Sequence, residues 1–304
     1  MSGRRIFTRP ARLAAIAPYA WMVLFFLVPF AFVAKISLSQ TAIAQPPYLP
    51  VFDLTQGIAA LKAAAAALSL DNFRLLVSDD LYVLSYLRSL MVAAVSTSIL
   101  LLIGYPIAYG MSRLPTRWQP IAMMLVIVPF WTSFLIRIYA WINILQHDGL
   151  LNKILLALHV VSAPVVWLST DSAMYLGIVY SYLPFMILPL YATLTKMEPA
   201  LLEAASDLGA SPRQAFWLVT FPLSLPGVAA GVLLCFIPIV GEFVIPDLLA
   251  GSNSLMIGQT LWLEFFTNKD WPVASAAAVM LLMLLLVPLI FYDRLQRRQL
   301  EDSR

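Results

Sequence analysis

Six long apolar stretches limit the folds open to this chain more than any other feature of its sequence. They lie approximately at residues 14–36, 83–110, 119–142, 172–195, 224–246 and 272–292. An α-helix needs about 20 apolar residues to cross about 30 Å of hydrocarbon. The stretches are continuous rather than alternating, and they exceed the roughly 10 residues of a barrel strand. With 61% hydrophobic residues and a mean hydropathy of +0.85, the chain is predicted to be an all-α integral membrane protein with six transmembrane helices.

Positive charges near the span ends predict the orientation. If the N-terminus is cytoplasmic, 12 of the 19 Lys and Arg residues lie on the cytoplasmic side and 7 on the opposite side or at the outer span ends. Cytoplasmic loops carry the excess of Lys and Arg, so both termini are predicted to be cytoplasmic. The first apolar stretch is longer than the roughly 7 to 15 residues of a signal-peptide core, which predicts an uncleaved span.

Three regions follow from this map. They are an N-terminal span with an extracytoplasmic segment (residues 1–82), a core of five spans (83–292) and a cytoplasmic tail (293–304).

A polar segment between the fourth and fifth stretches predicts two short helices that meet at a corner. Pro199 suits the first turn of a helix, and residues 201–208 are good helix formers. Gly209 is typical of a helix end. Ser211 before Pro212 predicts an N-cap followed by proline at the first position of a second helix, which continues through Phe216 and Trp217.

The same segment resembles the EAA loop of ABC-importer permeases. In that pattern, E-A-A is followed after three residues by Gly, and after nine more by I-x-L-P. The chain has E-A-A at residues 203–205, Gly209 and Pro222 in register, while Val219 and Phe221 replace the Ile and Leu with other bulky apolar side chains.

The resemblance extends over roughly residues 72–292 and implies a MetI-like permease of a type I ABC importer, with a cytoplasmic coupling loop at 196–222. The residues that it implies for coupling to an ATPase are Glu203, Ala204, Ala205, Asp207, Gly209 and Pro222. The implied partners are a second homologous permease, two ATP-binding cassette subunits and an extracytoplasmic substrate-binding protein. The implied location is a bacterial inner membrane.

Ionisable residues within or beside apolar stretches are candidates for contact with a substrate. Glu242 lies in the fifth stretch beside Gly241, and Asp247 follows five positions later. Such a carboxylate faces a bundle interior or a wet cavity, because burying it unpaired in lipid is costly. The string G-E-F-V-I-P-D resembles the spermidine/putrescine branch of these permeases, as does the stretch 129–152, which contains Arg137. Glu242 could instead have a structural role, and Arg137 could be an interfacial arginine that snorkels to the membrane surface.

Several kinds of chemistry have no motif in this sequence. It contains no G-x-x-x-x-G-K-[S/T] phosphate loop, so ATP is expected to be bound by partner ATPase subunits and not by this chain. No nucleophile elbow, H-E-x-x-H pair or spaced Cys/His cluster is present, so neither an enzyme nor a metal site is expected. No nucleic-acid-binding motif is present either. The single cysteine, Cys235, is expected to serve in packing.

The charge balance of the outer side favours a cationic substrate. Ten acidic residues, including Glu242, are predicted there against the 7 basic residues counted above. With the resemblance to the polyamine branch, putrescine or spermidine is the expected substrate. The alternatives are an opine or another amino-acid-like cation, ferric iron or thiamine. A secondary transporter driven by an ion gradient is the alternative class, although the two halves show no convincing correspondence.

Overall fold

The computed structural model describes residues 16, 18–51, 62, 63, 65–251 and 255–302. The chain forms two compact units, Met1–Asp80 with Leu261–Leu284 (unit 1) and Leu81–Thr260 with Leu285–Arg304 (unit 2). Parts of the predicted regions 1–82 and 293–304 lie outside the described residues. The division into residues 1–82, 83–292 and 293–304 stays a prediction.

Unit 1 combines short elements with one end of the last helix. Its elements are η1 (Val23–Leu27), α2 (Val28–Ser37), β1 (Gln40–Thr41), β2 (Tyr48–Leu49), α4 (Asp71–Ser78) and η5 (Leu263–Thr267), and α15 (Trp271–Asp302) begins here. The strands are antiparallel, with Gln40 opposite Leu49. The hydroxyl of Thr41 donates to Asp270 Oδ1 at 2.7 Å, and the ring of Tyr48 lies 6.3 Å from that of Trp271. These contacts hold the β-hairpin against the start of α15.

The regular elements in the described residues of unit 2 are all helices. Its helices are α5 (Asp80–Ser112), α6 (Gln119–Ile127), η3 (Val128–Trp131), α7 (Phe134–Leu145), α8 (Leu150–Ala157), α9 (Asp171–Leu194), α10 (Pro199–Asp207), α11 (Pro212–Ala215), η4 (Phe216–Thr220), α12 (Phe221–Val240) and α13 (Val244–Leu249). The helix α14 (Ile257–Trp262) begins in this unit.

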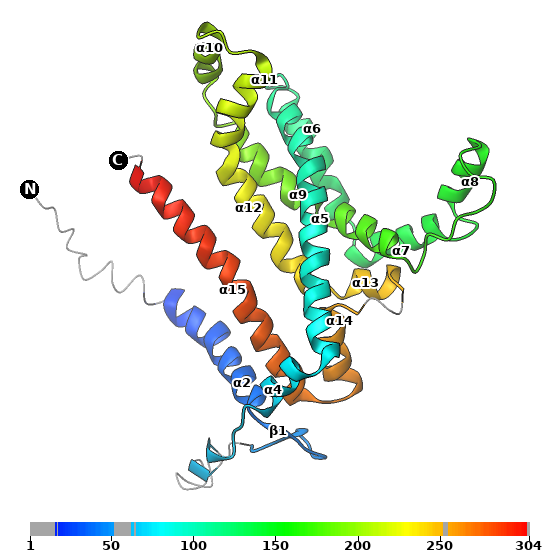
Figure 1. Ribbon diagram of the computed structural model, residues 1–304, viewed down its shortest axis with the longest axis vertical. Helices are drawn as coiled ribbons and strands as arrows, with labels where there is room; N and C mark the ends of the chain where they lie inside the picture. Colours follow the sequence, from blue (N-terminus) through cyan, green and yellow to red (C-terminus); the bar gives the residue numbers. More distant parts are fainter. Residues whose placement is uncertain (1–15, 17, 52–61, 64, 252–254, 303–304) are drawn as a thin grey trace, which may run out of the picture. The chain divides into compact units, whose positions relative to one another are not determined.

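Close packing of α9 against α12 forms the centre of unit 2 (Figure 1). Two glycines of α12, four residues apart, face α9. A Cβ on Gly227 would lie 2.5 Å from Thr193 Oγ1, and one on Gly231 would lie 2.8 Å from Met186 Sδ. Small residues with this spacing let two helix backbones approach closely within a membrane.

Five described helices are long and apolar enough to span a membrane, and a bent pair supplies a sixth if it counts as one span. The five are Pro18–Ser37, Asp80–Ser112, Asp171–Leu194, Pro212–Val240 and Trp271–Ile290, and the bent pair is Gln119–Trp131 with Phe134–Ala157. These spans agree with the six predicted apolar stretches in number and order, but three of them differ in detail.

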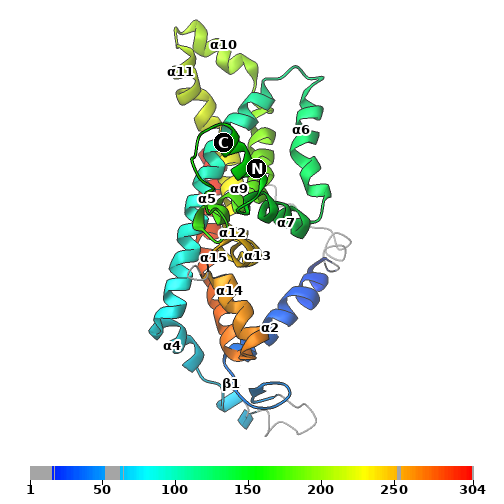
Figure 2. The ribbon, with the colours of Figure 1, turned by 90° about the vertical axis from the view of Figure 1, so that its right-hand side faces the viewer.

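The expectation of a continuous third span over 119–142 is wrong. The segment Gln119–Trp131, which contains α6 and η3, meets the segment Phe134–Ala157, which contains α7 and α8, at an angle of 88° (Figure 2). Pro129 favours a break here, because it has no backbone N–H and its ring clashes with the carbonyl four residues earlier. The chain instead forms the 3-10 turn η3, and the hydroxyl of Thr132 donates to Pro129 O at 2.8 Å. The helical conformation itself ends at Thr132 and Ser133, whose ψ angles are 153° and 138°.

The fifth and sixth helices differ from the predicted limits. The fifth begins at Pro212 instead of residue 224 and ends at Val240 instead of residue 246. The last helix continues through Asp302, so most of the predicted tail is helical. Charged and polar residues at 293–302 hide the extension of the last helix from a search for apolar stretches.

Candidate functional site

The segment at residues 196–222, called the corner segment below, contains two helices that meet at a glycine. α10 has Pro199 at its first position and ends at Asp207. Gly209 follows with φ +83°, a left-handed conformation that favours glycine. Hydrogen bonds from Gly209 N to Ser206 O (2.9 Å) and from Ala210 N to Ala205 O (3.0 Å) close the corner. The helix end predicted at Gly209 is confirmed.

The second helix begins at the predicted N-cap Ser211, which forms a capping box with Gln214. Gln214 N donates to Ser211 Oγ at 3.5 Å, and Ser211 N donates to Gln214 Oε1 at 2.8 Å. Pro212 is the first helical residue. The helix then continues without interruption through η4 into α12 and thereby joins the corner directly to a membrane span.

Pro222 lies inside this continuous helix and is preceded by the π-turn η4. Because proline has no N–H, the regular hydrogen-bond ladder cannot pass through it unchanged. Phe216, in the π-turn, packs edge-on against Tyr105 and Tyr109 of α5, with ring centroids 5.8 and 5.7 Å apart. This aromatic cluster connects the corner segment to α5. Sequence reasoning missed it because its members lie more than 100 residues apart.

The exposed surface of α10 carries both charged and apolar side chains. Glu203, Ala204 and Asp207 are exposed, and Ala205 is half-buried. Leu208 is 89% exposed and Leu201 is 44% exposed. Seven residues apart, the two leucines share one helix face. Figures 1 and 2 both show α10 beyond the ends of α5, α6 and α9. The sequence analysis did not identify the exposed leucines, although their heptad spacing was visible.

Glu242 does not lie inside a span as predicted, but in a break between two helices. α12 ends at Val240 and α13 begins at Val244. The carboxylate is 9% exposed and accepts a hydrogen bond from the hydroxyl of Tyr182 at 2.6 Å. Its other oxygen accepts from the backbone N–H groups of Val244 (3.0 Å) and Ile245 (3.4 Å). The carboxylate is therefore buried with hydrogen bonds to both oxygens, as a buried charge requires.

A glycine from α14 packs directly on this break. A Cβ on Gly258 would lie 2.5 Å from Gly241 O and 2.7 Å from Glu242 O. The backbones therefore approach so closely that only glycine fits. The start of α14 is in turn attached to α5, because Ile257 N donates to Ser89 Oγ at 2.8 Å. These contacts hold the Glu242 break between α5, α9 and α14.

Asp247 and Arg137 lie on neighbouring helices, since α13 packs against α7. Asp247 is exposed in the first turn of α13. Arg137 is half-buried, and its guanidinium lies over the ring of Phe130 at 4.6 Å. In the described part of the chain, Glu242, Asp247 and Arg137 share no hydrogen bond or ion pair. The structure therefore does not join the three predicted pathway residues into one cluster.

A chain of aromatic rings connects Arg137 with Glu242 instead. The ring of Phe130 lies 5.3 Å from that of Phe185, which lies 6.0 Å from the ring of Tyr182. Tyr182 then donates to Glu242. Aromatic faces attract cations, and a carboxylate at the end of the chain adds a charge of the opposite sign. The sequence search for ionisable residues did not consider Tyr182.

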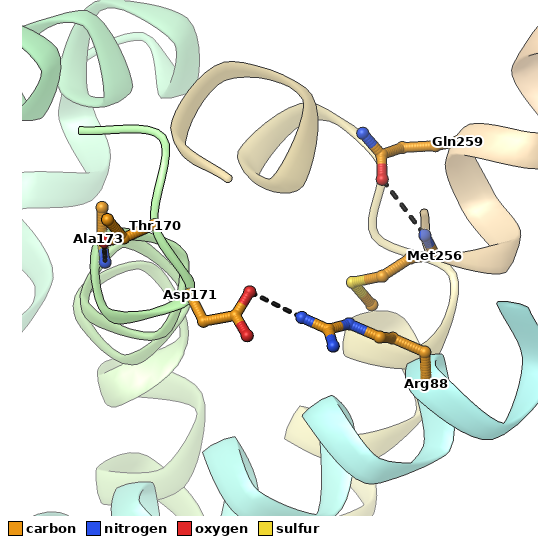
Figure 3. A network of polar contacts seen from close by, with 6 residues as sticks. All are labelled: Arg88, Thr170, Asp171, Ala173, Met256 and Gln259. Carbon is orange, nitrogen blue, oxygen red and sulfur yellow. Dashed lines mark hydrogen bonds and ion pairs between the residues drawn. The ribbon is translucent and has the colours of Figure 1, made fainter. Parts of the chain in front are cut away.

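An ion pair joins α5 to the start of α9 (Figure 3). Arg88 Nη2 lies 2.6 Å from Asp171 Oδ1, and the two side chains are 33% and 52% exposed. Figure 3 also shows the nearby hydrogen bond from Met256 N to Gln259 Oε1. A partly exposed pair of this kind contributes roughly 0–1 kcal/mol. Its contribution to stability is therefore small.

Comparison with known proteins identifies the family. Residues 85–301 match the family "Binding-protein-dependent transport system inner membrane component". The chain belongs to this family, so it is a multi-pass permease component of the inner membrane and not an enzyme.

The most similar relatives considered are spermidine/putrescine transport system permease proteins PotB. Those from Escherichia coli (strain K12) and Salmonella typhimurium (strain LT2) are each 41% identical over 75% of this chain, which covers 83% and 79% of their lengths. That from Haemophilus influenzae is 40% identical over 76% of this chain and 80% of its own.

Solved structures support the fold. A chain of a bacterial ABC transporter that imports the polysaccharide alginate matches with a TM-score of 0.69 at 17% identity, over 96% of this chain and 97% of its own. A chain of the MetNI methionine ABC transporter matches with a TM-score of 0.53 at 18% identity, over 71% of this chain and 94% of its own. The predicted MetI-like permease fold is confirmed.

Proposed function

We propose that this chain is the permease subunit of an ATP-driven importer of polyamines, putrescine or spermidine. The relatives at 40–41% identity, which are spermidine/putrescine permeases by name, carry the assignment of the substrate. The chain covers about four-fifths of their length. The ten acidic residues predicted on its outer side against seven basic ones agree with a cationic substrate.

The corner segment is the proposed coupling loop. Its two helices, its Gly209 corner and the exposed Leu201 and Leu208 suit an apolar groove on an ATPase subunit. Its second helix is continuous with a span, so a movement of the corner would be passed on to that span. Glu203, Ala204, Ala205, Asp207 and Pro222 belong to the same loop. ATP is then bound by the ATPase subunits and not by this chain.

The proposed assembly contains a second homologous permease, two ATP-binding cassette subunits and an extracytoplasmic binding protein. Closure of the ATPase dimer would drive alternating access through the two permeases. In this arrangement both termini are cytoplasmic. The span-rich core corresponds to residues 83–292, the outer segment to the later part of 1–82 and the tail to 293–304.

We place Glu242 beside the substrate path, together with the ring chain that ends at Tyr182. The opposing structural interpretation is that Glu242 only caps α13, and its three hydrogen bonds are compatible with that role as well. Asp247, exposed on α13, is a second acceptor for an ammonium group in this proposal. Arg137 lies over Phe130 at the other end of the ring chain and is a third candidate residue of the path in this proposal.

Glu242→Gln separates the two interpretations. A glutamine oxygen can accept from Val244 N and Ile245 N while its amide donates to the Tyr182 oxygen, so every hydrogen bond has a counterpart. Only the charge is lost. A path role predicts that spermidine uptake falls roughly tenfold, equivalent to about 1.4 kcal/mol, at equal membrane levels.

The matched control is Asp71→Asn, which removes one negative charge from an exposed side chain in unit 1. Its uptake is expected to equal that of the unmodified protein. Unchanged uptake by the Glu242→Gln variant contradicts the path role. If the Glu242→Gln variant loses folded protein from the membrane and shows no specific defect in transport, Glu242 has a structural role.

Substrate and energy source require separate tests. Competition of labelled spermidine uptake by an opine, an amino-acid-like cation, ferric iron or thiamine distinguishes the polyamine proposal from these alternatives. Uptake that continues without an ATPase partner but collapses with the proton or sodium gradient would indicate a secondary transporter.

A further inference from the structure

A cavity of about 200 Å³ lies in unit 2 between the start of the corner segment and the ends of three longer helices. Four elements contribute to it, namely the end of α5, the start of α6, the end of α9 and the start of α10. The lining residues are Ser112, Arg113, Gln119, Leu194, Thr195, Met197, Pro199 and Leu202. Neither the sequence analysis nor the proposed transport path uses this cavity.

The cavity lies where three candidate spans meet the membrane boundary. The span Asp80–Ser112 ends there, the span beginning at Gln119 starts there, and the span Asp171–Leu194 ends there. All three ends contribute a lining residue. Phospholipid head groups occupy this level of a membrane, so the cavity opens where phosphate groups are concentrated.

Arg113 is the charged group of the cavity. Its side chain is exposed, its guanidinium lies over the ring of Tyr109 at 5.1 Å, and it pairs with no carboxylate in the described part of the chain. A guanidinium offers up to five N–H donors in a fork that matches phosphate oxygens. Arg113 is therefore available to bind an anion.

The other polar lining groups already have partners within the protein. The hydroxyl of Ser112 donates to Tyr109 O at 2.8 Å, and that of Thr195 donates to Tyr191 O at 2.8 Å. Gln119 donates to Leu114 O at 3.0 Å and accepts from the hydroxyl of Tyr191 at 3.1 Å. These bonds fix the wall and leave Arg113 as the principal anion-binding group.

The remaining wall is apolar. Leu194 of α9, Met197, and Pro199 and Leu202 of α10 supply it. Inorganic phosphate gains nothing from such a surface, whereas the glycerol and the first acyl carbons of a phosphate ester can pack against it. Basic pockets between transmembrane helices on the cytoplasmic side are known to bind phospholipid head groups.

We propose that this cavity binds a phosphate ester, with Arg113 holding the phosphate and the apolar wall holding its carbon chain. A membrane phospholipid is the source that the position of the cavity favours. A soluble phosphate ester offers the same group and is the second source to be distinguished. Either ligand would contact Pro199 and Leu202 of α10 and would thereby brace the corner segment against α5 and α6.

The first arm of the test measures retained lipid. The full-length chain is purified with the subunits that accompany it, exposed to dioleoyl phosphatidylglycerol or dioleoyl phosphatidylcholine, and analysed by native mass spectrometry. Phosphatidylglycerol should bind the unmodified protein, and Arg113→Gln should weaken that binding about tenfold, as expected for one charge-assisted contact. Arg113→Lys, which keeps the charge, should restore part of it.

Arg117→Gln is the matched control. Arg117 is an exposed arginine in the same turn whose guanidinium lies 5.9 Å from the Trp118 ring and which does not line the cavity. Its loss should leave lipid binding unchanged. Equal weakening by the two Gln variants would indicate general surface attraction and would overturn the site.

The second arm detects soluble ligands. Cys235 is the single cysteine and is buried, so Thr195→Cys provides one exposed thiol at the cavity wall. If glycerol 3-phosphate slows the reaction of this thiol with a maleimide, and Arg113→Gln abolishes that protection, the cavity binds a soluble phosphate ester. Protection by phosphatidylglycerol alone supports the lipid source. No protection by either probe, together with lipid retention that does not depend on Arg113, overturns the proposal. Neither readout depends on transport, so the result is independent of the substrate assigned above.

Discussion

Substitution of Gly209 tests whether backbone conformation at the corner matters for coupling. Its φ is +83°, and a Cβ built there meets no atom within 4 Å. A side chain therefore fits sterically, and any effect comes from the backbone. A non-glycine residue in the left-handed region costs roughly 1–2 kcal/mol, which lowers the population of the corner about 5- to 30-fold. Asn tolerates this region better than Ala, and a β-branched residue tolerates it least.

The series Gly209→Asn, Gly209→Ala and Gly209→Val should therefore show progressively lower uptake and ATPase copurification at equal membrane levels. Gly110→Ala is the control. A Cβ at Gly110 also meets nothing within 4 Å, but its backbone is helical, so alanine should be neutral or stabilising by about 0.5–1 kcal/mol. If Val functions as well as Gly, or Asn functions as poorly as Val, the conformational explanation is wrong.

Four further predictions concern docking, packing, polar anchoring and orientation. Leu208→Asp, at an 89% exposed position, should reduce ATPase copurification without lowering the melting temperature; unchanged copurification contradicts docking through this face. Gly227→Ala places a Cβ 2.5 Å from Thr193 Oγ1 and should destabilise the chain by about 1–3 kcal/mol, visible as a lower melting temperature; an unchanged value contradicts the close α9–α12 packing. Asn152→Ala removes hydrogen bonds to Val165 and Trp167 from a fully buried side chain and should cost about 1–3 kcal/mol, whereas wild-type stability would show that these bonds are dispensable. A reporter fused after residue 304 should be active only in the cytoplasm, and activity outside would imply an odd number of spans.

Local sequence rules predicted the corner segment because its structure depends on neighbouring residues. Pro199 at a helix start, Gly209 at a helix end and Ser211 as an N-cap each act through backbone groups within a few positions. These local rules for helix starts and ends hold whether or not a membrane or a partner subunit is present. The sequence analysis treated the second short helix and the fifth span as separate elements, whereas they form one continuous helix, Pro212–Val240.

Apolar composition predicts that a stretch lies in the membrane, but it does not predict where the helix within that stretch is broken. The stretches 119–142 and 224–246 are continuously apolar, yet the chain bends after Trp131 and again after Val240. The prolines in both stretches indicated the possibility of a break but not its angle. A proline within a membrane helix can be tolerated with only a small kink.

The hydrogen-bond partners and packing of Glu242 could not be predicted from the sequence, because they come from residues far apart in the chain. Tyr182, its hydrogen-bond partner, is 60 positions away, and Gly258 packs on the break from a third helix. Sequence inspection could identify a buried carboxylate as unusual. It could not decide whether the charge was satisfied by the protein, because that depends on how α9, α13 and α14 pack together.

The most direct test of the central claim is energised uptake by a defined assembly. The chain is reconstituted in liposomes with its partner permease, its ATPase subunits and its binding protein, and labelled spermidine is added outside with ATP enclosed inside. The account predicts saturable accumulation that requires both ATP and the binding protein and that persists when ion gradients are dissipated. Accumulation without ATP, or ATP-driven accumulation of another substrate while spermidine and putrescine are ignored, would contradict it.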